Sequence, residues 1–145
     1  MFNTVLILCH GNICRSPAAE YLLKALLKHK AMTIHSAGLG ALVGHAADSH
    51  MQEMMRDKDI NLTPHKARQV NTSMIQQADL VLVMEQQQIE AVTQLNLSAR
   101  GKTKLLTQWT TGFDVPDPFK RSQEVTELSR DAIIQGCLAW VDYLD

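Results

Sequence analysis

The sequence lacks a long apolar run, an even set of cysteines and any excess of charge of one sign. No stretch approaches the roughly 18–20 consecutive apolar residues of a membrane-spanning helix, and the N-terminal residues lack the basic region of a signal peptide. Fourteen Lys and Arg against 15 Asp and Glu leave a net charge of −1, which argues against general affinity for nucleic acid or anionic membranes. We therefore expect a cytoplasmic protein with no nucleic-acid partner and no membrane insertion, in which any anion site is local.

The three cysteines cannot form a complete disulfide framework, so at least one free thiol is available for chemistry. What the sequence does have is the composition of a globular protein, with 46% hydrophobic and 20% charged residues. A length of 145 residues is about that of one domain. We expect residues 1–145 to form a single domain that is a monomer or a weak oligomer.

Short apolar runs alternate along the chain with segments of helical periodicity. Residues 5–8 and 79–84 are typical of strands buried on both faces, and residues 32–36 and 104–106 are weaker strands. Helices are expected at residues 16–30, 49–58, 73–77, 85–95 and 124–143. This alternation predicts the α/β class, a single three-layer domain with a four-stranded parallel sheet flanked by helices on both faces.

Two helices carry further local predictions. Ser16 followed by Pro17 is typical of an N-cap and a first helical position. The spacing of the last helix predicts that one face turns inward, comprising Val125, Leu128, Ala132, Ile133, Gly136 and Trp140.

The segment after the first strand reads CHGNICRSP from Cys9, and the carboxyl end of a parallel strand is where such sheets bind ligands. A loop of this length that leads into a helix can turn its backbone N–H groups inward around an anion such as phosphate. Gly11 and Asn12 are residue types that tolerate the positive φ of a tight loop. Inward amides and Arg15 would favour the thiolate of Cys9, and the guanidinium can hold two phosphoryl oxygens.

With these residues the sequence resembles the low-molecular-weight protein tyrosine phosphatases, whose motif is Cys-x5-Arg-Ser near the N-terminus. Asp117-Pro118-Phe119 matches the Asp-Pro-aromatic motif of that family, and Ser36 and His65 fall at positions that the family uses. The resemblance spans the whole chain.

The resemblance implies hydrolysis of phosphotyrosine through a cysteinyl-phosphate intermediate without metal or other cofactor, and it assigns catalytic roles to Cys9, Arg15 and Asp117. It assigns support of the loop to Ser36 and His65 in a polar network with Asn12, and it places Ser16 in a hydrogen bond to the cysteine sulfur. The other residues expected to bind substrate are Gly11, Asn12, Ile13, Cys14, Ser16 and Phe119.

The variable positions refine this expectation. Phe119 is followed by Lys120 and Arg121, which looks like the bacterial branch that acts on autophosphorylating tyrosine kinases of capsule and exopolysaccharide export. A kinase of that kind is therefore the expected partner. Ile13 resembles the tyrosine-directed members, whereas relatives that act on phosphoarginine carry threonine there. The wall from residues 39–43 has no aromatic side chain.

Several alternatives stay open. Cys14 is either loop packing or a partner for a reversible disulfide with Cys9, whereas Cys137 is expected to be structural. Asp114 is a second candidate acid beside Asp117, and His10 is expected to point outward.

Arsenate reduction on the same fold would need two more thiols near residues 80–90, where there are none. A non-catalytic phosphate-binding module is the remaining alternative.

Overall fold

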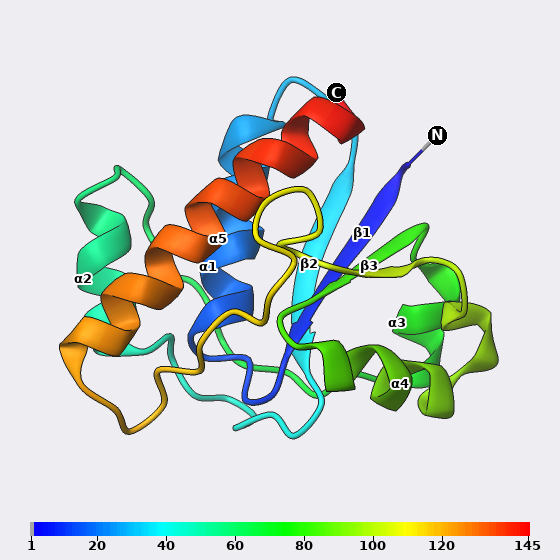
Figure 1. The fold of residues 1–145 in the computed structure, drawn as a ribbon, viewed down its shortest axis with the longest axis horizontal. Coiled ribbons are helices and arrows are strands. Elements are labelled where there is room, and N and C mark those ends of the chain that lie inside the picture. Colours follow the sequence, from blue (N-terminus) through cyan, green and yellow to red (C-terminus); the bar gives the residue numbers. More distant parts are fainter. Residues whose placement is uncertain (1) are drawn as a thin grey trace.

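Four parallel strands lie side by side in the centre of the computed structural model, which describes residues 2–145 (Figure 1). Their order is β2-β1-β3-β4, and their bounds are Thr4–Cys9 for β1, Thr33–Gly38 for β2, Leu80–Val83 for β3 and Thr103–Leu105 for β4. Cys9 pairs with Gly38 and Leu8 with Val83, so the carboxyl ends of the three longer strands meet at one edge.

Helices cover both faces of this sheet, so the predicted three-layer α/β class is confirmed. One face carries α1 (Arg15–Leu26), α2 (Ser49–Arg56) and α5 (Gln123–Leu144), and the other carries α3 (Thr72–Gln77) and α4 (Gln86–Leu95), as Figure 1 shows. A short 3-10 helix, Leu97–Ala99, was not predicted.

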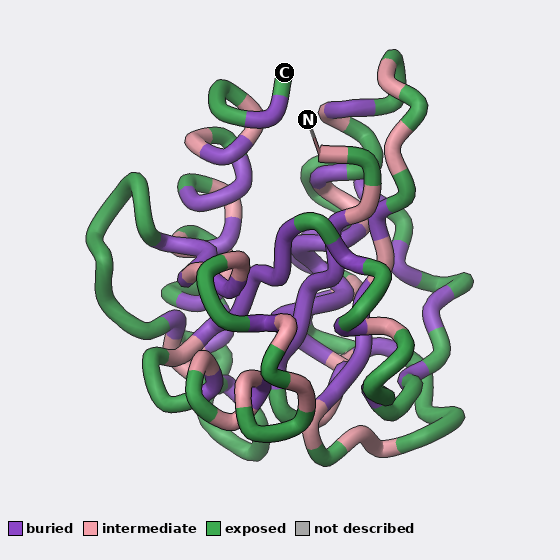
Figure 2. Tube along the Cα trace, turned by 90° about the vertical axis from the view of Figure 1, so that its right-hand side faces the viewer, coloured by how far each residue is buried: buried purple, intermediate pink, exposed green. Residues whose placement is uncertain are grey.

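The β1 strand explains why its sequence is apolar without alternation. Val5 and Ile7 face the core beneath α1 and α5, whereas Leu6 and Leu8 face the core beneath α3 and α4. Because the strand is covered on both faces, all four side chains have no exposed surface. The buried strands therefore form the centre of the molecule, and the exposed residues lie mainly in the loops and on the outer helix faces (Figure 2).

The prediction of Ser16 as an N-cap is wrong. Helix α1 begins at Arg15, with Cys14 in the N-cap position and no side chain bonded to the free N–H groups. The Ser16 hydroxyl is used elsewhere, 2.9 Å from the Cys9 sulfur. Because no side chain caps this helix, the N–H groups of its first turn stay available, as they are at helix N-termini that bind anions.

The predicted inner face of α5 is partly wrong. Ile133, Gly136 and Trp140 are buried as expected, but Leu128 is 57% exposed. Thr126 and Ser129 are buried in its place. Hydropathy does not favour these two hydroxyl residues for a core, so their burial could not be predicted from the spacing of apolar residues.

A Gly136→Ala substitution is expected to lower the free energy of unfolding by about 1–2 kcal/mol. A Cβ at this position would lie 2.9 Å from the carbonyl oxygen of Leu106, a backbone atom that cannot rotate away. Overpacking costs up to about 3 kcal/mol and exceeds the gain of about 1 kcal/mol in helix propensity. Denaturant unfolding measures this difference, with Gln135→Ala on the exposed face as control. An unchanged or higher midpoint for Gly136→Ala would contradict the prediction.

Candidate active site

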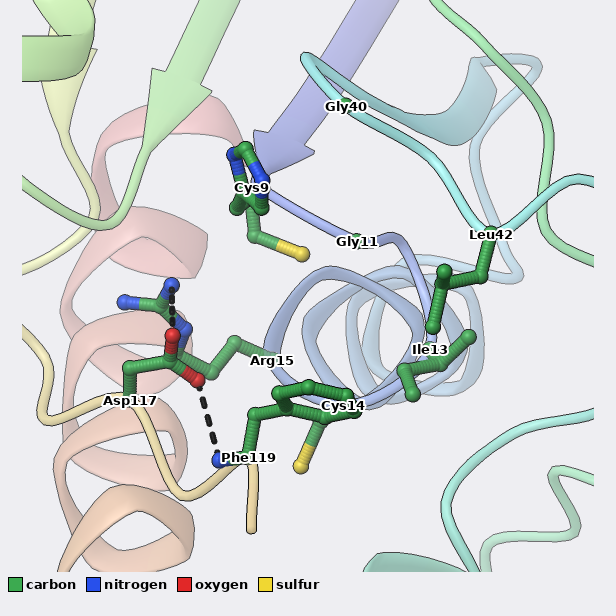
Figure 3. Close-up of a pocket in the computed structure, with 10 residues that line it drawn as sticks. Cys9, Gly11, Ile13, Cys14, Arg15, Gly40, Leu42, Asp117 and Phe119 are labelled. Carbon is green, nitrogen blue, oxygen red and sulfur yellow. Dashed lines mark hydrogen bonds and ion pairs between the residues drawn. The ribbon is translucent and has the colours of Figure 1, made fainter.

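The loop between β1 and α1 forms one wall of a cavity of about 160 Å³ at the carboxyl edge of the sheet. The segment that leads into α5 forms another wall, which brings Asp117 and Phe119 to the same cavity (Figure 3). Of the predicted site residues, the lining includes Cys9, Gly11, Ile13, Cys14, Arg15, Asp117 and Phe119. Asn12 and Ser16 are fully buried behind them.

Asn12 gives the loop its tight curvature. Its φ is +58°, and its backbone carbonyl accepts a hydrogen bond of 2.7 Å from His65 Nε2. Its side-chain Oδ1 accepts a bond of 2.9 Å from the Arg68 N–H. The prediction of a positive φ is thus confirmed for Asn12, but it is wrong for Gly11, which does not have one. His65 and Arg68, two partners outside the loop, thus hold the carbonyl and the side chain of Asn12 in place.

Cys9 is 3% exposed, and its sulfur lies at the base of the cavity, 2.9 Å from Ser16 Oγ. The Asn12 amide donates to both Ser16 Oγ and Ser36 Oγ, at 2.8 and 3.0 Å. The structure therefore joins the predicted supporting residues in one buried network. Sequence reasoning missed its last member, Glu20, which accepts a hydrogen bond from Ser36 Oγ.

Arg15 places a buried positive charge on the wall of the same cavity. It is 2% exposed, and its Nη1 donates to Glu85 Oε2 at 2.7 Å and to the Val115 carbonyl at 2.9 Å. Its Nη2 lies 3.6 Å from Asp117 Oδ2. Glu85 was not predicted, although it follows a buried strand directly and so had to lie at the functional edge of the sheet.

The two candidate acids differ in position. Asp117 is half-exposed on the rim of the cavity, where its Oδ1 accepts a hydrogen bond of 3.1 Å from the Phe119 N–H (Figure 3). Asp114 does not line the cavity and accepts a bond of 2.8 Å from the Gln86 N–H at the start of α4. The geometry therefore favours Asp117. Lys120 follows with a φ of +56°, its Nζ 5.4 Å from the centre of the Phe119 ring.

The opposite wall contains Gly40 and Leu42, from the segment expected to supply it, together with His10. The His10 ring is exposed as predicted, but it packs against Gly40, where a Cβ would lie 2.7 Å from the ring Cε1. Any larger residue at position 40 would therefore displace a side chain that lines the cavity.

The other two cysteines are buried thiols. Burial, followed by the nearby Asp48, raises the pKa of Cys14, and burial raises that of Cys137. In Figure 3 the Cys14 sulfur points away from the Cys9 sulfur, and a disulfide between the two stays a prediction.

Within residues 2–145, no three His, Cys, Asp or Glu side chains are grouped so that they could hold a metal ion, and no helix is long and apolar enough to cross a membrane.

Comparison with known proteins agrees with this geometry. Residues 4–145 match the family described as low molecular weight phosphotyrosine protein phosphatase. A putative low molecular weight protein-tyrosine-phosphatase of Klebsiella pneumoniae is 42% identical over 144 residues, which covers 99% of each chain. The crystal structure of the Erwinia amylovora tyrosine phosphatase AmsI superposes with a TM-score of 0.94 at 38% identity, covering 99% of this chain and 93% of that one. Vibrio vulnificus Wzb in complex with benzylphosphonate gives 0.93 at 37% identity, covering 99% of both chains. The chain therefore belongs to the low molecular weight protein-tyrosine-phosphatase family.

Proposed function

We propose that this protein hydrolyses phosphotyrosine in proteins by way of a phosphate covalently bound to Cys9. The observation that carries the proposal is the convergence of a buried thiol, a buried guanidinium and a rim carboxyl on one small cavity. A buried positive charge at an uncapped helix N-terminus favours an anionic ligand, and the sulfur lies at the base of the same cavity.

The reaction proceeds in two displacements. The Cys9 thiolate attacks phosphorus in line, a sulfur–phosphorus bond forms, and the bond to the tyrosine oxygen breaks as Asp117 in its acid form gives that oxygen a proton. Water then attacks phosphorus, Asp117 takes a proton from the water, and the thiolate leaves with release of inorganic phosphate. Arg15 binds the phosphoryl oxygens in both steps.

The partner we propose is an autophosphorylating bacterial tyrosine kinase, and we propose that the two proteins meet in the cytoplasm. Phe119 and Leu42 supply apolar surface for the tyrosine ring, and Lys120 beside Phe119 adds positive charge at the mouth. The structure of the Vibrio relative contains benzylphosphonate, a phosphonate that carries an aromatic ring, which supports an aromatic substrate for this chain. Arsenate reduction is not supported, because Cys137 lies fully buried on α5 and does not line the cavity.

A steady-state comparison of one peptide carrying phosphotyrosine, phosphoserine or phosphoarginine tests this function. In the presence of chelator, kcat/KM for phosphotyrosine is expected to exceed the others by roughly 100-fold, because the aromatic ring fills the apolar part of the cavity. Equal rates, or a preference for phosphoarginine, would refute the substrate class. Binding of all three peptides without turnover would instead indicate a phosphate-binding module.

A further inference from the structure

A buried carboxylate, Glu20, lies behind the loop that holds Cys9 and does not line the cavity. It is 2% exposed and follows Ser16 by one turn of α1. Its Oε1 accepts a hydrogen bond of 2.5 Å from Ser36 Oγ, and its Oε2 accepts one of 2.6 Å from Lys24 Nζ. A buried charge is costly unless it is paired and hydrogen-bonded, so both oxygens are satisfied here.

Glu20 is connected to the Cys9 sulfur by an unbroken line of buried hydrogen bonds. From Glu20 the line passes to Ser36, then to the Asn12 amide at 3.0 Å, then to Ser16 at 2.8 Å, and then to Cys9 at 2.9 Å. All five side chains are at most 3% exposed. Solvent therefore does not compete for these bonds.

The direction of each proton in this line follows from its two ends. A carboxylate only accepts, so the single Ser36 proton points to Glu20 and the Ser36 oxygen faces Asn12 as an acceptor. The Arg68 N–H occupies Asn12 Oδ1, so the Asn12 nitrogen donates one hydrogen to each serine. The Ser16 oxygen accepts from this nitrogen, and with Cys9 as the thiolate of the proposed function, which can only accept, the Ser16 proton is directed to the sulfur.

We propose that Glu20 is a positioning residue for Cys9. By accepting the Ser36 proton it holds Ser36 as an acceptor for Asn12, and this fixes the amide orientation from which Ser16 donates to the sulfur. A donated hydrogen bond favours the charged thiolate over the neutral thiol. The proposal rests on the proposed function of Cys9 as the nucleophile.

Two substitutions of Glu20 test this role. Glu20→Met removes the acceptor at similar size and is expected to lower kcat for p-nitrophenyl phosphate by roughly 10- to 100-fold with little change in KM. Glu20→Gln keeps the shape and a weaker acceptor, so its loss should be smaller. The rate at which iodoacetate alkylates Cys9 at one fixed pH should fall in the same order, because the thiolate is the reactive form. Glu90→Gln, the same change on the exposed face of α4, should alter neither rate.

A double substitution shows whether Glu20 acts through Ser36. If it does, Glu20→Met together with Ser36→Ala should be no worse than the more damaging single change. The proposal would be overturned if the double variant lost activity by the product of the two single losses. It would also be overturned if both Glu20 variants kept the wild-type kcat and the wild-type alkylation rate. If Glu20→Met does not fold, the kcat and the alkylation rate of the near-isosteric Glu20→Gln variant decide instead. A wild-type protein that hydrolyses no phosphotyrosine would refute the proposed function, and alkylation would still decide the role of Glu20.

Discussion

A Cys9→Ser variant is expected to lose hydrolysis of p-nitrophenyl phosphate by a factor of roughly 10⁴ or more while still binding inorganic phosphate. The loss follows because a serine hydroxyl at this position has no adjacent base, so it remains neutral and a poor nucleophile. Binding should persist because Arg15, the loop amides and the helix N-terminus are unchanged, and removal of the thiolate also removes a like charge from beside the anion. Steady-state kinetics and titration calorimetry with phosphate measure the two properties separately.

The matched control is Cys137→Ser, which makes the same chemical change in the core. Cys137 is fully buried on α5, and its Sγ lies 3.8 Å from the Ala19 carbonyl, so the variant changes packing and leaves the cavity intact. It should retain kcat even if its stability falls. Substantial turnover by Cys9→Ser would exclude covalent catalysis by this thiol.

Asp117→Asn is expected to lower kcat for phosphotyrosine peptides by roughly 10²- to 10³-fold, the usual contribution of a general acid. The tyrosine phenolate is a poor leaving group, since its conjugate acid has a pKa of about 10, and asparagine cannot supply the proton. The loss should be much smaller for p-nitrophenyl phosphate, whose phenol is more acidic and departs without help. The ratio of the two losses, measured by steady-state kinetics, isolates proton donation from binding.

Asp114→Asn provides the comparison for this prediction. Asp114 lies outside the cavity, where it accepts a hydrogen bond from the first residue of α4, and it should show no dependence on the leaving group. If Asp117→Asn lowered kcat by the same factor for both substrates, Asp117 would not be the proton donor. Its effect would then come from its contact with Arg15, whose Nη2 lies 3.6 Å from Asp117 Oδ2.

The local hydropathy pattern of the sequence was sufficient to predict most of the strands and helices. Residues 5–8 form a strand because four consecutive apolar side chains can all be buried when both faces are covered, and the helices alternate with strands as their periodicity indicated. The same pattern failed where a residue serves a distant partner. Ser16 has the sequence of an N-cap, but its hydroxyl is bonded to Cys9 and Asn12. Leu128 has the spacing of a core residue, but α5 buries Thr126 and Ser129 in its place.

The sequence alone determined the chemistry of the site, because thiol, guanidinium and helix N-terminus are carried by one continuous segment of nine residues, Cys9 to Pro17, from the end of β1 to the first turn of α1. Only the tertiary structure decided which groups surround that loop. Glu20 and Glu85 are separated by 65 positions, and each contacts the loop network through a side chain whose partner no local spacing specifies. Such contacts depend on how α1, β2 and β3 are brought to one edge of the sheet, and that arrangement follows from packing of the whole chain.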